Sequence, residues 1–364
     1  MASALAMVLL GTSPGAAWAG LVFNFTPASG MDPQAIAGFA AAGARWSALF
    51  SDNITVNINI NFTNLPAGVL GSTGSTQANY TYANVRNALI ADKTSADDNT
   101  STAALQAGPA FNMLLNRTSN NPNGSGSATP YLDNDGDANN TTINMSNANA
   151  KALGLLAANN AAVDASISFS NLFTWDFDPS NGINAGAFDF VGIATHEIGH
   201  ALGFISGVDI LDINSPPVRG PFRDDQFTFV STADLFRFSA ASVQQGVGVI
   251  DWTADTRNKY FSVDGGTTAG ALFSNGVNFG GDGRQASHWR DNLGLGIMDP
   301  TAAPGELLAI SNNDIRLFDV IGYNLGATPA VPEPGSLALL AIGACGLAGY
   351  ARRRKANAAA EQAA

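Results

Sequence analysis

The sequence predicts an α+β fold, and three features of the chain point to that class. Apolar residues occupy every second position from Ile54 to Phe62, which is the pattern of a strand with one buried face. An apolar stretch over 188–204 includes Gly203 where a buried helix would end. Helix-capping residues occur near both ends of the domain, at Asp32 and at Ser311. Helices and strands therefore follow one another irregularly, and we find no internal repeat.

The order of the elements follows from the same signals. The first helix begins at Asp32, because aspartate caps a helix and Pro33 suits its first turn. The last helix begins at Ser311, which forms a capping-box pattern with Asp314, and Gly322 ends it. We expect, in chain order, a strand over 21–25, a helix over 33–50, a strand over 54–62, a helix over 82–92, strands over 142–145 and 166–175, a hairpin around 260–266 and a helix over 312–321.

Three stretches between these elements have weaker signals. Residues 71–75 are glycine, serine and threonine, which predict a turn, and residues 116–140 are rich in Asn, Ser and Gly, which predict a loop. Residues 208–283 contain several short apolar segments. We expect them to form a long β-rich excursion before the chain continues to the last helix.

The composition restricts the partners of this chain of 364 residues. Its net charge is −12 and only 13% of its residues are charged. This argues against nucleic acid, because phosphate binding requires clustered Lys and Arg. The single cysteine, Cys345, lies in an apolar run near the C-terminus, so disulfides cannot stabilise the main domain. Core packing has to do so, with calcium as a candidate aid.

Both ends of the chain resemble export and sorting segments. Residues 1–19 predict a secretory signal peptide, although the first basic residue is Arg45. Residues 328–335 form a linker with a Pro-Glu-Pro motif, 336–355 an apolar helix with a basic cluster, and 356–364 a tail. This layout resembles a PEP-CTERM signal, which an exosortase reads and removes; an ordinary anchor is the alternative. The apolar run of about 15 residues is short for a permanent span, so we expect transient membrane association and an exported domain over 20–327.

The central candidate site is the run His196, Glu197, Ile198, Gly199 and His200. Residues four apart lie on one face of a helix, so both imidazoles can reach one metal ion. Neutral imidazole is a good zinc ligand, and Glu197 is placed to act as the general base of metal-assisted hydrolysis. The chain has three histidines in all, which argues against a chance pair at this spacing.

These residues resemble the metzincin clan of zinc peptidases, whose motif is H-E-x-x-H-x-x-G-x-x-H followed by a Met-turn. Gly203 matches the motif, whereas Ser206 replaces its last histidine. The leishmanolysin-like branch has a long insertion before its third histidine, and His288 precedes Met298 here in a similar way. The resemblance implies that both helix histidines and His288 bind zinc, and that Met298 forms the hydrophobic base of the site.

The resemblance also covers other parts of the chain. The segments A-S-H-W-R-D, I-M-D-P and D-I-R-L-F-D-V-I-G-Y resemble bacterial metzincin-like proteins that end in a PEP-CTERM signal. It implies a twisted mixed sheet over the zinc helix in an N-terminal subdomain to about residue 205, and a C-terminal subdomain over 206–327. Substrate peptides of metzincins pair with an edge strand, here expected at 166–175. Gluzincins use a downstream glutamate as the third zinc ligand. Glu306 is therefore an alternative third ligand, which we rank below His288.

A second metal candidate lies in the polar loop, at Asp133, Asp135 and Asp137. Carboxylates at alternate positions around Gly136 suit a calcium ion. No glutamate follows at the spacing of an EF-hand, so a solvated turn is the preferred interpretation.

We therefore expect an exported zinc-dependent endopeptidase in the cell envelope or extracellular matrix of a Gram-negative bacterium. It would act on peptides or proteins with Glu197 as the base, and an exosortase would be its sorting partner. A catalytically inactive matrix or surface binding protein on the same scaffold is one alternative. Metal-dependent hydrolysis of a non-peptide bond is another. A pseudoenzyme would be expected to lose Glu197 or one of the metal ligands, and none of these is lost here, which favours the enzyme.

Overall fold

The computed structural model describes residues 20–215, 218–220 and 222–326. Helices and strands are mixed along these residues, which confirms the α+β class. The helices are α1 Pro33–Ser47, α2 Tyr82–Asp92, α3 Ala96–Ala104, α4 Ala138–Thr141, α5 Asn147–Ala152, α6 Phe190–Leu202, α7 Val208–Asn214, α8 Ala240–Val243 and α9 Asn312–Val320. The strands are β1 Val22–Pro27, β2 Thr55–Thr63, β3 Gly71–Ser75, β4 Gln77–Thr81, β5 Met113–Leu115, β6 Tyr131–Asp133, β7 Thr142–Ser146, β8 Ala165–Ser170, β9 Trp175–Asp176, β10 Phe188–Asp189, β11 Arg237–Phe238, β12 Ile250–Asp251, β13 Lys259–Phe261 and β14 Leu272–Phe273. Short 3₁₀ turns are η1 Pro179–Asn181, η2 Asp224–Gln226 and η3 Ala233–Phe236.

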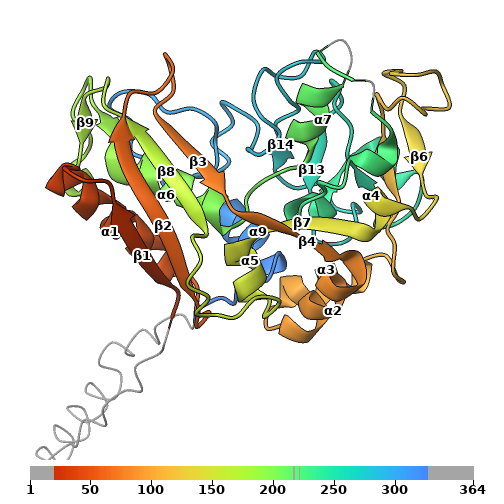
Figure 1. Ribbon diagram of the computed structural model, residues 1–364, viewed down its shortest axis with the longest axis horizontal. Helices are drawn as coiled ribbons and strands as arrows, with labels where there is room; N and C mark the ends of the chain where they lie inside the picture. The colour runs from red at the N-terminus through yellow and green to blue at the C-terminus, as the bar shows by residue number, and fades with distance from the viewer. Residues whose placement is uncertain (1–19, 216–217, 221, 327–364) are drawn as a thin grey trace, which may run out of the picture. The chain divides into compact units, whose positions relative to one another are not determined.

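The largest sheet in the described part of the chain has four strands in the order β1-β2-β8-β3 (Figure 1). Strands β1, β2 and β8 are parallel, whereas β3 is antiparallel to β8 and forms one edge. The period-two pattern of β2 is confirmed, because Val56, Ile58 and Ile60 are buried and the asparagines between them are partly or fully exposed. One face of the sheet is therefore apolar and has to be covered.

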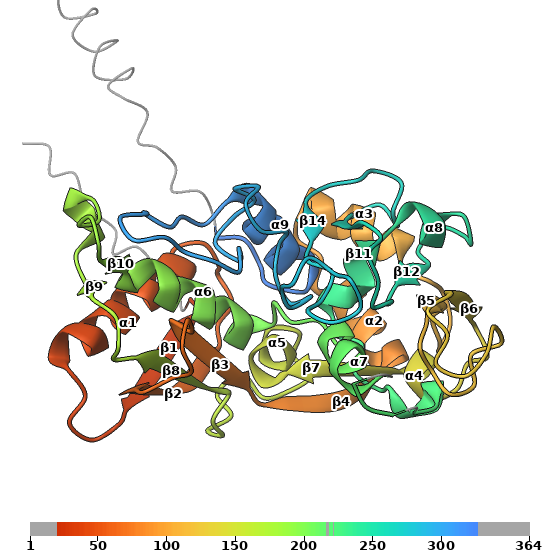
Figure 2. The same ribbon diagram turned by 90° about the horizontal axis from the view of Figure 1, so that it is seen from above.

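Helices α1 and α6 cover this face (Figure 2). The ring centroids of Phe39 in α1 and Phe190 in α6 lie 5.5 Å apart, and Phe169 of β8 lies 5.1 and 4.6 Å from them. Aromatic pairs at these separations stabilise a core beyond their buried area. The Trp46 indole of α1 also donates a hydrogen bond to the Thr195 carbonyl of α6 at 2.9 Å. Helix α6 is thus held by both the sheet and α1.

The other strands form small sheets in the orders β12-β5-β6, β11-β13-β14, β4-β7 and β10-β9. Strands β5 and β6 precede residue 205, yet they share a sheet with β12, which follows it. Segments from both expected subdomains therefore pack together. The described residues up to Leu325 belong to one compact unit.

Both predicted helix starts are confirmed. The Asp32 carboxylate accepts a hydrogen bond from the backbone N–H of Gln34 at 2.8 Å, at the start of α1. Ser311 and Asp314 form the capping box that begins α9. Helix α6 ends at Gly203, whose φ of +121° favours glycine.

Two expectations about the main sheet are wrong. Residues 71–75 form β3 rather than a turn, because their small side chains allow the strand to lie against α6. There the Ser75 hydroxyl donates a hydrogen bond to the His200 carbonyl at 3.0 Å. Strand β8 lies between β2 and β3, so the stretch 166–175 is not the edge strand.

The excursion over 208–283 is not β-rich. Its strands are two or three residues long and are separated by helices α7 and α8 and by irregular segments. Here carboxylates, rather than neighbouring strands, accept hydrogen bonds from several backbone N–H groups. Asp234 accepts from the N–H groups of Gly207 and Ser231, and Asp212 accepts from the N–H of Val277. The predicted loop over 116–140 is mostly irregular, but it contains β6 and α4.

None of the helices that the structure describes is long and apolar enough to span a membrane. The expected signal peptide at 1–19 and the C-terminal segments over 328–335, 336–355 and 356–364 lie outside the described residues.

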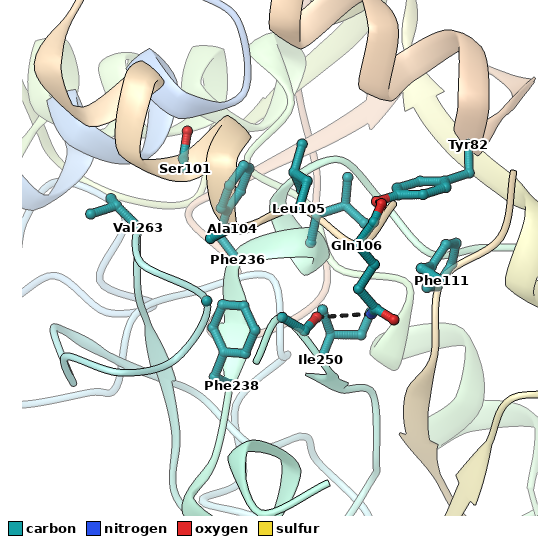
Figure 3. A pocket seen from close by; sticks show the side chains of 13 residues that line it. Tyr82, Ser101, Ala104, Leu105, Gln106, Phe111, Phe236, Phe238, Ile250 and Val263 are labelled. Carbon is teal, nitrogen blue, oxygen red and sulfur yellow. Dashed lines mark hydrogen bonds between the residues drawn. The ribbon is translucent and has the colours of Figure 1, made fainter. Parts of the chain in front are cut away.

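A small cavity lies beside α2, α3, β11 and β12 (Figure 3). Most of its lining is apolar, including Phe111 and Phe238, and the Gln106 amide donates a hydrogen bond to the Gly248 carbonyl at 2.9 Å. The volume of about 10 Å³ is enough for one water at most. This cavity is therefore part of the core and cannot be a substrate site.

Candidate metal centre

Helix α6 carries two of the predicted ligands on one face. The helix begins at Asp189, whose carboxylate accepts a hydrogen bond from the N–H of Gly192 at 2.7 Å. The ring centroids of His196 and His200, one turn apart, are separated by 4.7 Å. Local helix geometry is therefore sufficient to bring these two imidazoles together.

His288 reaches the same place from the loop that follows β14. Its Nε2 lies 3.2 Å from Nε2 of His200, which in turn lies 3.1 Å from Nε2 of His196. All three rings present the same nitrogen to one another. The structure thus brings together the three histidines that the sequence analysis selected.

The other nitrogen of each ring, Nδ1, lies against a main-chain carbonyl. The acceptor is the oxygen of Ile297 for His196, at 2.8 Å, and that of Phe204 for His200, at 2.7 Å. For His288 it is the oxygen of Gln285, at 3.2 Å. A carbonyl can only accept, so Nδ1 has to carry the proton and Nε2 keeps its lone pair. Each imidazole is therefore oriented as a metal ligand through Nε2.

Three lone pairs that face one another at these distances cannot form hydrogen bonds among themselves. A cation between them removes the repulsion. Zinc holds each nitrogen ligand at about 2.0–2.1 Å, which separates two nitrogens of a tetrahedral site by about 3.3–3.4 Å. The separations of 3.1 and 3.2 Å are close to this value. The residues present fit a zinc ion.

Burial keeps these imidazoles neutral. It lowers the pKa of His196 to about 4. Burial, with a smaller effect of the neighbouring His196, lowers the pKa of His200 to about 3. Burial, followed by the charges of the other two histidines, holds the pKa of His288 well below its usual value. Neutral imidazole is the form that binds metals. At neutral pH the three histidines therefore have the protonation state that metal binding requires.

Glu197 is 5% exposed and is held by the edge strand β3. Its Oε2 accepts a hydrogen bond from the Thr73 hydroxyl at 2.6 Å. Burial raises the pKa of Glu197 to about 7, and the bond from Thr73 opposes this rise. A carboxyl group with a pKa near neutrality can both accept and return a proton. The role of Thr73 was not predicted from the sequence, because this residue belongs to a stretch with the composition of a turn.

Met298 is fully buried and packs against α6 at Gly199. A Cβ atom on Gly199 would lie 2.4 Å from the Met298 sulfur, much closer than van der Waals contact. Glycine at this position therefore allows the thioether to approach the helix directly beside His200.

The loop of His288 is held by residues of the excursion and of the segment after α6. Asp209 of α7 accepts hydrogen bonds from the N–H groups of Ala286 at 2.6 Å and Ser287 at 3.2 Å. The N–H of Ser206 donates to the Ser287 hydroxyl at 2.9 Å. Ser206, which stands where the motif has its last histidine, therefore contacts the loop that carries His288.

Asp314 connects α9 to the loop of Met298. Its fully buried carboxylate accepts hydrogen bonds from the Trp289 indole at 2.8 Å and from the N–H groups of Ile297, Met298 and Ser311 at 2.9, 3.3 and 2.7 Å. The sequence marks Asp314 only as a helix cap. Its second role could not be predicted, because the partners in the other loop are brought close by folding.

Replacing Asp314 by asparagine is expected to lower the free energy of unfolding by about 2–4 kcal/mol, because an amide cannot accept all four bonds. Zinc affinity is expected to fall about 10–100-fold, since Ile297 orients His196. Urea unfolding and competition with a chromophoric chelator measure these two quantities. Asp178→Asn, at an exposed carboxylate, is the control. Equal stability and zinc affinity in both variants would contradict the role of Asp314.

The histidines and Glu197 line a cleft of about 560 Å³, a volume typical of ligand sites. Its lining also includes residues 68–73, residues 299–302, and Arg284, Gln285 and Ser287 from the loop of His288. Arg284 lies in this lining and forms an ion pair with Asp291 at 3.0 Å. Asp299 also lies there, and burial raises its pKa to about 6. The sequence analysis identified neither as a cleft residue.

The rival ligand Glu306 lies outside the histidine cluster. It is exposed, and its carboxylate accepts a hydrogen bond from the N–H of Ala303 at 2.8 Å. This is a local turn contact.

The predicted calcium residues are only partly brought together. Oxygens of Asp133 and Asp135 lie within 4.8 Å of each other and of Asp224, a residue that the sequence analysis did not select. Asp137 is not in that group, and its carboxylate caps α4 by accepting a hydrogen bond from the N–H of Asn139 at 3.2 Å.

Comparison with protein families finds a PEP-CTERM protein-sorting motif over residues 330–355. This confirms the C-terminal sorting signal that the sequence predicts. The motif is read by an exosortase and indicates a secreted protein, sorted to the cell envelope or the extracellular space. No curated protein and no solved structure matches the chain.

Proposed function

We propose that the chain is an exported zinc-dependent endopeptidase. The observation that carries the proposal is the convergence of three imidazole nitrogens and a buried glutamate in one cleft. The helix motif, followed at a distance by His288 and Met298, resembles the leishmanolysin-like branch of the metzincins. The sorting motif supports export.

The residues of the cleft have separate roles in this proposal. A zinc ion bound in such a site would act as a Lewis acid and polarise the scissile carbonyl. Glu197 accepts a proton from the attacking water and delivers it to the leaving amine. Thr73 orients the Glu197 carboxylate. The carbonyls of Ile297, Phe204 and Gln285 hold the imidazoles in the tautomer that can bind the metal.

Strand β3 supports a peptide as the substrate. It is the last strand of the four-stranded sheet, and its residues 71–73 line the cleft beside Glu197. The free backbone groups of an edge strand can pair with an extended peptide. Such pairing would recognise the peptide backbone itself, which favours a peptide bond over other hydrolysable bonds.

The proposal is tested by measuring zinc content and casein cleavage of the purified full chain. We expect one zinc per chain and cleavage that a chelator abolishes and added zinc restores. Zinc without cleavage of casein or of a peptide library would contradict the peptidase, leaving a binding protein or a hydrolase of another bond. A chain that binds no zinc would contradict the metal centre itself.

Replacing Gly71 by alanine is expected to lower kcat about 10–100-fold, because small displacements of a catalytic group are costly. A Cβ atom on Gly71 would lie 2.6 Å from Oε1 of Glu197 and would push the carboxylate aside. Gly74→Ala in the same strand is the matched control, since its Cβ atom would meet only the Ser166 carbonyl, at 4.0 Å. Steady-state kinetics with a peptide substrate and zinc analysis distinguish the two variants. Equal kcat values would contradict the contact.

A further inference from the structure

A group of carboxylates lies apart from the histidines, where two distant segments meet. Asp133 ends β6, Asp135 follows in the turn before α4, and Asp224 begins η2 (α4 and β6 are labelled in Figure 1). Oxygens of these three residues lie within 4.8 Å of one another. Asp133 and Asp224 are only 3% and 4% exposed.

The negative charge of this group is not balanced by basic side chains. In the described ranges, no lysine or arginine forms an ion pair with Asp133, Asp135 or Asp224. Burial raises the pKa of Asp133 to about 7, and the charges of Asp224, Asp135 and Asp137 add to this rise. Buried carboxylates without a cationic partner are costly, and a cation among them would lower that cost.

Asn139 gives an independent indication of a ligand. It is fully buried, and its Nδ2 donates a hydrogen bond to Oδ2 of Asp133 at 2.8 Å, which places its amide group directly beside the carboxylates. The amide oxygen, Oδ1, has no hydrogen-bond partner among the described residues. A buried oxygen without a donor is unfavourable, whereas amide oxygens are common ligands of hard cations.

We propose that Asp133, Asp135 and Asp224, with the amide oxygen of Asn139, bind a calcium ion. Calcium takes six to eight oxygen ligands in flexible geometry, and waters can complete the set. The donors are all oxygens, which disfavours zinc. Exposed Asp135 leaves one side open to water. This site is independent of the histidine cluster and does not rest on peptidase activity.

The bound ion would connect three parts of the fold. Asp224 also accepts hydrogen bonds from the Asn120 amide at 2.6 Å and from the Tyr131 hydroxyl at 3.2 Å. The ion would therefore link the loop after β5, strand β6 and the excursion that holds the His288 loop. The described residues contain no cysteine, so calcium would have the cross-linking role that disulfides have in many exported proteins.

Calorimetric titration of the metal-depleted full chain with calcium chloride tests the site, with magnesium chloride as the comparison. We expect one calcium per chain and a rise in Tm of about 5 °C at a calcium concentration near 100 times Kd. Asp224→Asn should weaken calcium binding at least tenfold and remove most of the rise. Asp178→Asn is the matched control and should retain both, because Asp178 is exposed, is not in the carboxylate group and caps only η1, where asparagine can also serve. No calcium-dependent rise in the wild-type chain, or equal rises in both variants, would overturn the proposal.

Terbium luminescence of the wild-type chain keeps the test independent of how the variants fold. Tyr131 contacts Asp224 and can sensitise a terbium ion bound beside it. We expect emission on tyrosine excitation that calcium displaces and magnesium displaces poorly. Emission that calcium does not displace would count against the site. Failure of the zinc proposal would change neither this readout nor the calcium titration.

Discussion

Replacing Glu197 by glutamine is expected to reduce casein hydrolysis by about 10²–10⁴-fold, the usual contribution of a general base. Glutamine keeps the volume of the side chain and can still contact Thr73. Its amide, however, cannot accept a proton from water at neutral pH. Zinc content should stay at one per chain, because Glu197 makes no contact that orients an imidazole. Initial rates and elemental analysis on the same preparations measure both quantities.

The control for this variant is Glu306→Gln, which removes an exposed carboxylate outside the cleft. It should retain full activity and full zinc. If Glu197→Gln cleaved casein as fast as this control, Glu197 would not be the base. Loss of zinc together with activity would instead indicate that Glu197 stabilises the metal centre.

Replacing His288 by alanine is expected to weaken zinc binding by more than about 100-fold, beyond the 10–100-fold typical of outer partners. The change removes one of the three clustered nitrogens and leaves the two imidazoles on α6. Casein cleavage should be lost with the metal. Competition with a chromophoric chelator measures the affinity, and circular dichroism checks that the chain stays folded.

Glu306→Ala separates the two candidates for the third ligand. Its carboxylate contacts only a local N–H group, so zinc affinity should not change. Full zinc retention in His288→Ala would reject His288 as a ligand. Zinc loss in Glu306→Ala would instead support the gluzincin-like alternative.

Elements with local signals were predicted well. Strand β2 follows from its alternation, and the starts of α1 and α9 follow from Asp32 and Ser311, because capping bonds join residues two or three apart. Elements whose stability depends on distant partners were missed. Strand β3 has the composition of a turn, and it forms because β8 and α6 provide its hydrogen bonds.

The same distinction applies to the residues of the proposed calcium site. Asp133 and Asp135 are close in sequence, so their alternation was visible. Asp224 could not be found, because contacts formed on folding, such as the one between α4 and η2, bring it to them. Asp137 has the right spacing, but its carboxylate is used as a helix cap.

The sequence alone was sufficient to select His196, Glu197 and His200 as a candidate site, since the helix repeat places residues four apart on one face. It also determined the sorting motif, which is a linear pattern. How His288, 88 residues from His200, reaches the same point can be seen only in the folded chain. That approach depends on the carboxylates of Asp209 and Asp314, which accept hydrogen bonds from backbone N–H groups of two loops. Such contacts join residues with no fixed spacing, so no local pattern could specify them.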